Sequence, residues 1–161
     1  GLKALIQQLF QTLERDFGKE LVQLALGFLT FSVKGVSDIE MEDLLSLHDG
    51  VLDTVFQYAR PKVRRLPSHV WLRLKSAMEG LVTEGEQNCY LWYHRQLKET
   101  AEMWFAEQKP MVEALMAMYF GNRLDQTLAR NRRIASQEWT LRGDPFDVTS
   151  VVNKRRVFEA T

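Results

Sequence analysis

The chain has 161 residues, a length that fits a single domain or one compact domain with a tail. Hydrophobic residues make up 45% and aromatic residues 11% of it, which excludes a disordered chain. Its 21 basic residues equal its 21 acidic residues, so overall charge argues against a general polyanion binder. The single cysteine, Cys89, excludes an internal disulfide, and no uncharged apolar run reaches the roughly 18 residues that span a bilayer. We therefore expect a cytoplasmic protein that does not enter a membrane, and, from Gly1 and Thr161 at its ends, part of a longer chain.

The first 34 residues predict two helices. In residues 2–17 the apolar positions recur at three-four spacing and line one face: Leu5, Ile6, Leu9, Phe10, Leu13 and Phe17. After Gly18, residues 21–33 are apolar on nearly every side, which is typical of a helix packed centrally among others. We expect this region to pack on the core that follows.

Three further helices are predicted between residues 35 and 80. Ser37 and Glu40 match a capping box, which predicts that a helix begins there. A short helix over residues 51–56 follows Asp49-Gly50. Pro67 is suited to the first turn of another helix, whose apolar positions are Val70, Trp71, Leu74 and Met78.

A β-hairpin and two helices complete the pattern. Residues 81–83 and 88–93 favour strands around the polar turn 84–87. Helical spacing returns at His94, and Pro110 opens a last helix. We predict a mainly α fold, a winged helix with a three-helix core and a β-hairpin wing, carrying additional N- and C-terminal helices. The predicted divisions are 1–34 for the N-terminal helices, 35–106 for the winged helix, 107–124 for a C-terminal helix, and 125–161 for an extended or partly helical tail that leads to a repeat region.

Three kinds of catalytic chemistry are disfavoured. The only Gly-Lys pair, Gly18-Lys19, is followed by Glu20, so the phosphate-binding loop of an NTPase is missing. The three histidines are far apart and Cys89 stands alone, which argues against a metal site. Cys89 and His94 lie five residues apart across a strand-to-helix junction, where their side chains diverge. We expect no catalytic residue, no metal and no enzyme activity in this chain.

Charge is segregated along the middle of the sequence. Residues 37–59 hold six acidic residues and no Lys or Arg, and residues 60–75 hold six basic residues and no acid. One interpretation is solvated helix faces, some of them paired with each other. The other is two opposed patches that dock onto a partner domain. The candidate interface residues are Arg64, Arg65, Arg73, Lys75, Asp38, Glu42 and Asp43.

Nucleic-acid binding is an alternative function. A winged helix commonly lays its third helix in the major groove, and here that region carries Arg64, Arg65, His69, Arg73 and Lys75. Two features disfavour it: the wing tip is acidic at Glu84 and Glu86, and Trp71 and Leu74 are expected in the core.

Several short motifs, in this order, resemble the winged-helix region of the STAND class of signal-transduction ATPases. Within that class the chain is most similar to NACHT proteins that carry WD or tetratricopeptide repeats. The resemblance covers about residues 15–120. It rests on Gly18-Lys19-Glu20-Leu21, Gly35-Val36-Ser37, Glu42-Asp43-Leu44-Leu45, Arg64-Arg65-Leu66-Pro67, Trp71-Leu72-Arg73-Leu74 and Trp92-Tyr93-His94-Arg95-Gln96-Leu97.

The resemblance implies a regulatory role inside a larger ATPase. In that class a histidine at the strand-to-helix junction contacts the β-phosphate of ADP held by the ATPase domain. By resemblance, His94 occupies this position. The chain departs from the pattern at the next residue, because Arg95 stands where plant resistance and apoptotic relatives have an acid. The implied cofactor is ATP or ADP in the parent protein and none in the chain alone. The implied partners are the ATPase and repeat domains of the same protein, together with other proteins. A protein-docking scaffold with no nucleotide link is the remaining alternative.

Overall fold

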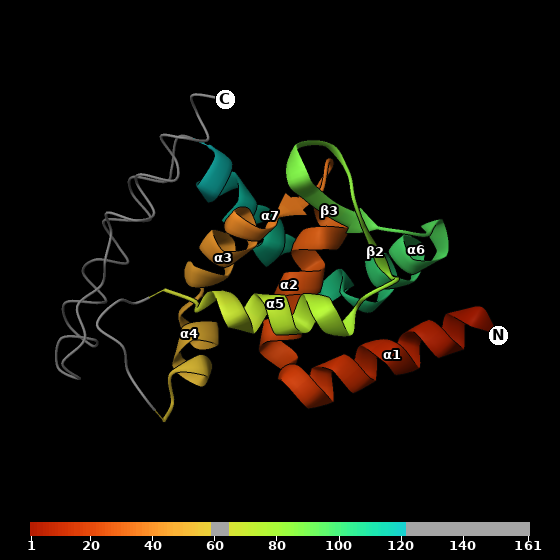
Figure 1. Cartoon of the computed structure of the whole chain (residues 1–161), viewed down its shortest axis with the longest axis horizontal. Helices are drawn as coiled ribbons and strands as arrows, with labels where there is room; N and C mark the ends of the chain where they lie inside the picture. Colours follow the sequence, from red (N-terminus) through yellow and green to blue (C-terminus); the bar gives the residue numbers. More distant parts are fainter. Residues whose placement is uncertain (59–64, 122–161) are drawn as a thin grey trace, which may run out of the picture.

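The computed structural model describes residues 1–58 and 65–121, which form seven α-helices and a small sheet (Figure 1). Arg64, the last residues of the predicted C-terminal helix and the predicted tail 125–161 lie outside the described residues. No helix in the described part of the chain is long and apolar enough to cross a membrane.

The first two helices form the base of the core. α1 (Leu2–Phe17) and α2 (Lys19–Phe31) are separated by Gly18, whose φ of 96° is readily reached only by glycine. α2 is buried over most of its length and packs against α1, α3, α6 and α7, as its apolar sequence predicts. The N-terminal helices therefore share one hydrophobic core with the elements that follow.

The next three helices form the core of the winged helix. They are α3 (Asp38–Ser46), α4 (Asp49–Val55) and α5 (Ser68–Ala77). The predicted capping box is confirmed, because Ser37 Oγ accepts from the Glu40 amide and Glu40 Oε1 accepts from the Ser37 amide. α3 and α4 lie at the end of the molecule opposite α6 (Figure 1).

The wing is a three-stranded antiparallel sheet of order β1-β3-β2. The hairpin of β2 (Val82–Glu84) and β3 (Cys89–Trp92) was predicted, and a 3₁₀ turn, η1 (Glu86–Asn88), joins the two strands. The sequence did not predict β1 (Val36–Ser37), which pairs Val36 with Tyr90. A strand of two residues carries no periodic pattern and is defined only by its partner.

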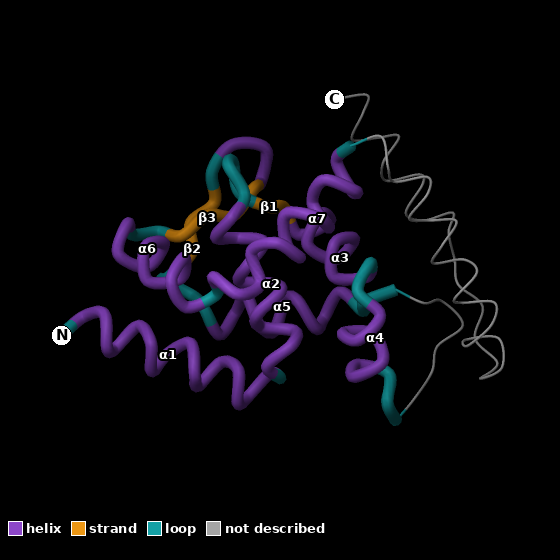
Figure 2. The backbone as a smooth tube through the Cα atoms, turned by 180° about the vertical axis from the view of Figure 1, so that it is seen from behind, coloured by secondary structure: helices purple, strands orange, loops and turns teal. Residues whose placement is uncertain are grey.

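The last elements are α6 (Arg95–Trp104), η2 (Ala106–Gln108) and α7 (Lys109–Phe120). Phe10 of α1 packs on Trp92, Trp104 and Phe105, with ring centroids 5.2 to 6.3 Å apart. These contacts tie the start of the chain to the end of the wing. In the reverse view of Figure 2, the sheet lies beside α6 at the end where the N-terminus lies. The predicted fold class, a winged helix with additional helices before and after it, is confirmed.

Candidate functional site

His94 lies where the central strand of the sheet leads into α6. Trp92 fixes the strand side of this junction, since it is buried and its Nε1 donates to Thr30 Oγ1 at 3.0 Å. Leu97 fixes the helix side, where it is buried in the core. The intervening residues Tyr93 and His94 are exposed. The fold thus presents the imidazole at the surface between two elements that are anchored in the core.

One nitrogen of the His94 ring is already used. His94 is the N-cap of α6, and its Nδ1 accepts from the Gln96 amide at 3.2 Å. The neutral ring in this arrangement carries its proton on Nε2, which can donate to an acceptor outside the domain. His48 caps α4 in the same way, accepting from the Val51 amide at 3.2 Å, but its side chain is half-buried.

An apolar groove of about 370 Å³ lies next to His94, between α1 and the base of the wing. Leu5 is 63% exposed and Tyr93 is 68% exposed at its edge. The sequence analysis placed Leu5 on the apolar face of the first helix and gave no role to Tyr93, so the groove was missed. Its lining residues are Leu2, Leu5, Ile6, Leu9, Gly80, Leu81, Tyr93, His94, Gln96 and Leu97.

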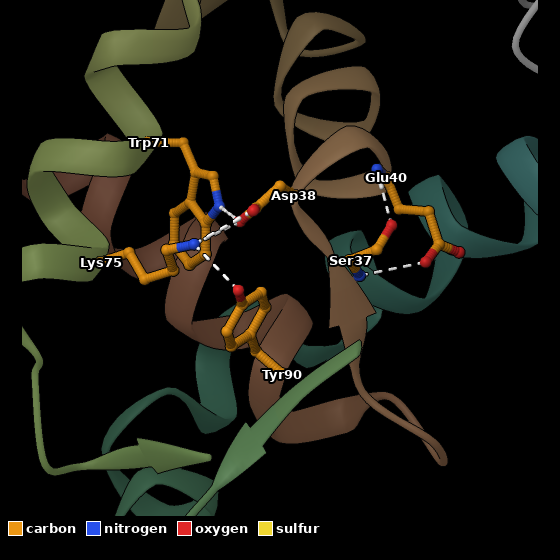
Figure 3. Close-up of polar contacts among 6 residues, drawn as sticks. All are labelled: Ser37, Asp38, Glu40, Trp71, Lys75 and Tyr90. Atoms are coloured by element: carbon orange, nitrogen blue, oxygen red, sulfur yellow. Dashed lines mark hydrogen bonds and ion pairs between the residues drawn. The ribbon is translucent and has the colours of Figure 1, made fainter. Parts of the chain in front are cut away.

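The predicted acidic and basic patches contact each other across α3 and α5. Asp38 Oδ1 accepts from Trp71 Nε1 at 2.7 Å and from Lys75 Nζ at 2.8 Å (Figure 3). Lys75 also donates to the Tyr90 hydroxyl at 3.1 Å. Burial by itself lowers the pKa of Lys75, but its hydrogen bonds to Asp38 and Tyr90 outweigh burial and raise it. This network joins α3, α5 and β3 inside the domain.

The acidic residues further along α3 are buried. Asp43 is fully buried, where it forms an ion pair with Arg65 and accepts from the Tyr119 hydroxyl. Glu42 is also buried and accepts from Ser68 Oγ. The docking interpretation is therefore wrong for Glu42 and Asp43, because side chains enclosed in the domain cannot contact a partner. A sequence shows charge runs but not which members of the two runs meet.

Among the described residues, the remaining candidate interface residues do not form a basic surface. Asp38, Arg65 and Lys75 are partly buried and occupied by the contacts above, whereas Arg73 is exposed on α5. The wing tip is acidic, with Glu84 and Glu86 exposed. Within residues 1–58 and 65–121 this distribution does not favour binding of nucleic acid, which needs several free cations along the contact face.

Cys89 does not have the surroundings of a nucleophile. It is buried at the opposite end of β3 from the junction with α6, and burial together with the nearby Glu40 carboxylate raises the pKa of its thiol. Within residues 1–58 and 65–121, no group of three His, Cys, Asp or Glu side chains lies close enough to hold a metal ion.

Comparisons with known proteins place this arrangement in a family. A family model described as "NWD1-like, winged helix-turn-helix domain" matches residues 1–109. The chain belongs to this family. The match begins in α1 and ends where α7 begins, so it contains the wing, the groove and His94. No solved structure matches the chain.

The curated relatives are much longer proteins. The chain is 32% identical over 122 residues to the mouse (Mus musculus) NACHT and WD repeat domain-containing protein 2. The aligned region covers 71% of the chain and 7% of that protein. Identity to the human (Homo sapiens) protein of the same name is 36% over 101 residues, covering 60% of the chain and 6% of that protein. The mouse NACHT domain- and WD repeat-containing protein 1 is 29% identical over 131 residues, covering 76% of the chain and 8% of that protein. The chain thus spans less than a tenth of the length of these relatives.

Proposed function

We propose that this chain is a non-catalytic regulatory module of a larger, cytoplasmic NACHT-type ATPase, in which His94 senses the bound nucleotide. In the resting protein His94 Nε2 donates to a phosphate oxygen of ADP held by the ATPase domain. Exchange for ATP weakens this contact, and the winged helix moves away from the ATPase domain and frees surfaces for other proteins. The names of the relatives, which contain NACHT and WD repeats, support ATPase and repeat domains in the same polypeptide.

The observation that carries the proposal is the exposed imidazole with one nitrogen free. Because the Gln96 amide occupies Nδ1, the ring is oriented before any ligand arrives and Nε2 remains as the donor. The N-terminus of α6 adds its positive end to the same place, which favours a phosphate. A hydrogen bond to a charged oxygen is worth more than one between neutral groups.

The groove supports a domain contact around His94. A domain that brings a phosphate to His94 must also cover the surface next to it, and that surface is apolar and exposed at Leu5 and Tyr93. Burial of such a patch stabilises a contact between domains. One interface would then combine apolar packing with a single polar contact, from His94, whose strength depends on whether ADP or ATP is bound.

A second candidate is a docking module with no nucleotide link. It is favoured by the cap itself, because His48 makes the same Nδ1 contact at the start of α4, and its other recorded contact, with Glu20 Oε1 at 3.5 Å, also lies within the domain. In this case the groove still binds a protein, but His94 serves only α6.

Two substitutions of His94 in the full-length protein separate these candidates. His94→Ala removes both the cap and the imidazole, whereas His94→Ser keeps an oxygen that can cap the helix but cannot reach a phosphate. If His94 holds ADP, both variants release a fluorescent ADP analogue at least about tenfold faster than wild type, the loss expected for one hydrogen bond to a charged group. His69→Ala, at an exposed histidine on α5, is the matched control and leaves release unchanged. Wild-type release by His94→Ser would contradict nucleotide sensing and favour the docking module.

A further inference from the structure

α7 packs onto the winged helix from outside it. The family match ends at residue 109, and α7 occupies residues Lys109–Phe120. It lies along α2 at Gly27, where a Cβ placed on the glycine would be 2.7 Å from Val112 Cγ2. Val112 is fully buried in this contact. Glycine therefore allows α7 to approach α2 more closely than any other residue would.

The far end of α7 is held by a polar contact. The Tyr119 hydroxyl donates to Asp43 Oδ2, and Arg65 binds the same carboxylate from another direction. We call these three residues the Asp43 clasp. It joins α7 to α3 and to the residue that precedes α5 by three positions.

α7 has two fully buried side chains. Val112 and Tyr119 are buried, Leu115 and Met116 are partly buried against the core, and Met111 remains 49% exposed. A helix held by few fully buried side chains opens at a lower free energy than one buried over most of its length, such as α2. When α7 is released, the Asp43 carboxylate keeps its ion pair with Arg65 and becomes accessible to water. Release therefore does not leave an unpaired charge buried, which would cost a large free energy.

We propose that α7 is a releasable strap on the winged helix. α7 detaches from α2 and α3 while α1–α6 and the sheet stay folded, and the Tyr119 contact in the Asp43 clasp sets how often this occurs. Detachment exposes the surface of α2 around Gly27 together with Asp43. This inference does not depend on nucleotide binding by His94.

Hydrogen exchange measured by mass spectrometry on the whole chain tests the strap. Tyr119→Phe removes one hydroxyl and keeps the ring, so α7 amides should exchange at least about tenfold faster, as expected for a lost hydrogen bond to a charged group. Exchange in α1 and α2 should stay at the wild-type rate. Tyr93→Phe, at an exposed tyrosine, is the matched control and should change nothing in α7. Val112→Ala weakens the contact of α7 with α2 at Gly27. This variant should also accelerate exchange in α7 and leave exchange in α1 and α2 at the wild-type rate.

The alternatives give different results. Acceleration that is equal in α1, α2 and α7 would mean that α7 unfolds only together with the whole domain, which overturns the strap. Wild-type exchange of α7 in Tyr119→Phe would overturn the role of the clasp, and wild-type exchange in both variants would overturn the proposal as a whole.

Discussion

Gly27→Ala tests how closely α7 approaches α2. The added methyl group would lie 2.7 Å from Val112 Cγ2, 3.9 Å from its Cβ and 4.0 Å from its Cγ1. A carbon-carbon contact at 2.7 Å is well inside the ordinary packing distance of about 3.5–4.0 Å, so the two helices must move apart. Overpacking of this kind costs about 2 kcal/mol, whereas Ala in place of Gly inside a helix gains about 1 kcal/mol. We therefore expect Gly27→Ala to lower the free energy of unfolding by about 1 kcal/mol.

The same substitution should have the opposite sign when Val112 is shortened. Val112→Ala removes the methyl group that clashes, and the methyl group added at position 27 then partly fills the space that Val112 leaves. In this background Gly27→Ala should raise the free energy of unfolding by about 1 kcal/mol, which makes the coupling between the two sites about 2 kcal/mol.

Urea unfolding of four proteins measures this coupling: wild type, the two single variants and the double variant. Equal dependence on urea concentration in all four would show that the comparison is between similar unfolded states. If Gly27→Ala stabilises the wild-type chain, or if the two substitutions are additive, the close contact between α2 and α7 does not exist and the reasoning is refuted.

Two further predictions concern the α3 end of the domain. Ser37→Ala removes the acceptor that binds the Glu40 amide at 3.2 Å, and should lower the free energy of unfolding by about 1 kcal/mol in urea denaturation; an unchanged value would show that the capping box is not stabilising. Because the pKa of Lys75 is raised in the folded state, its contribution to stability is complete below the unfolded pKa of about 10.4 and is lost as the pH rises through the folded value. Asp38→Asn should therefore be less stable than wild type at about pH 8, by a margin that shrinks towards about pH 11 in the same assay; a constant margin would contradict the role of Lys75.

Local patterns in the sequence predicted most of the elements. The capping box at Ser37 and Glu40 marked the start of α3, since its two hydrogen bonds involve residues only three apart. The change from alternating to helical spacing marked the junction at His94. Such features depend on neighbours in the chain, and the resemblance to NACHT proteins then supplied a reason to single out His94.

Contacts between distant residues were not predictable in the same way. Asp43 and Tyr119 are 76 positions apart, and the sequence does not show that a hydroxyl and a buried carboxylate meet. A charged residue is rarely buried unless it is paired, and the partners of Asp43 are distant in the sequence. Asp43 was therefore interpreted as an exposed docking residue, which was wrong. The groove beside His94 was missed for a related reason: periodicity predicted an apolar face on α1 but not that its N-terminal part is left uncovered.

The most direct test of nucleotide sensing compares the affinities of the full-length protein for ADP and AMP, in wild type and in His94→Ser. These ligands differ by the β-phosphate that His94 is proposed to bind. If His94 binds the β-phosphate, His94→Ser weakens ADP binding at least about tenfold and leaves AMP binding unchanged. Equal weakening for both ligands, or no weakening for either, would contradict it.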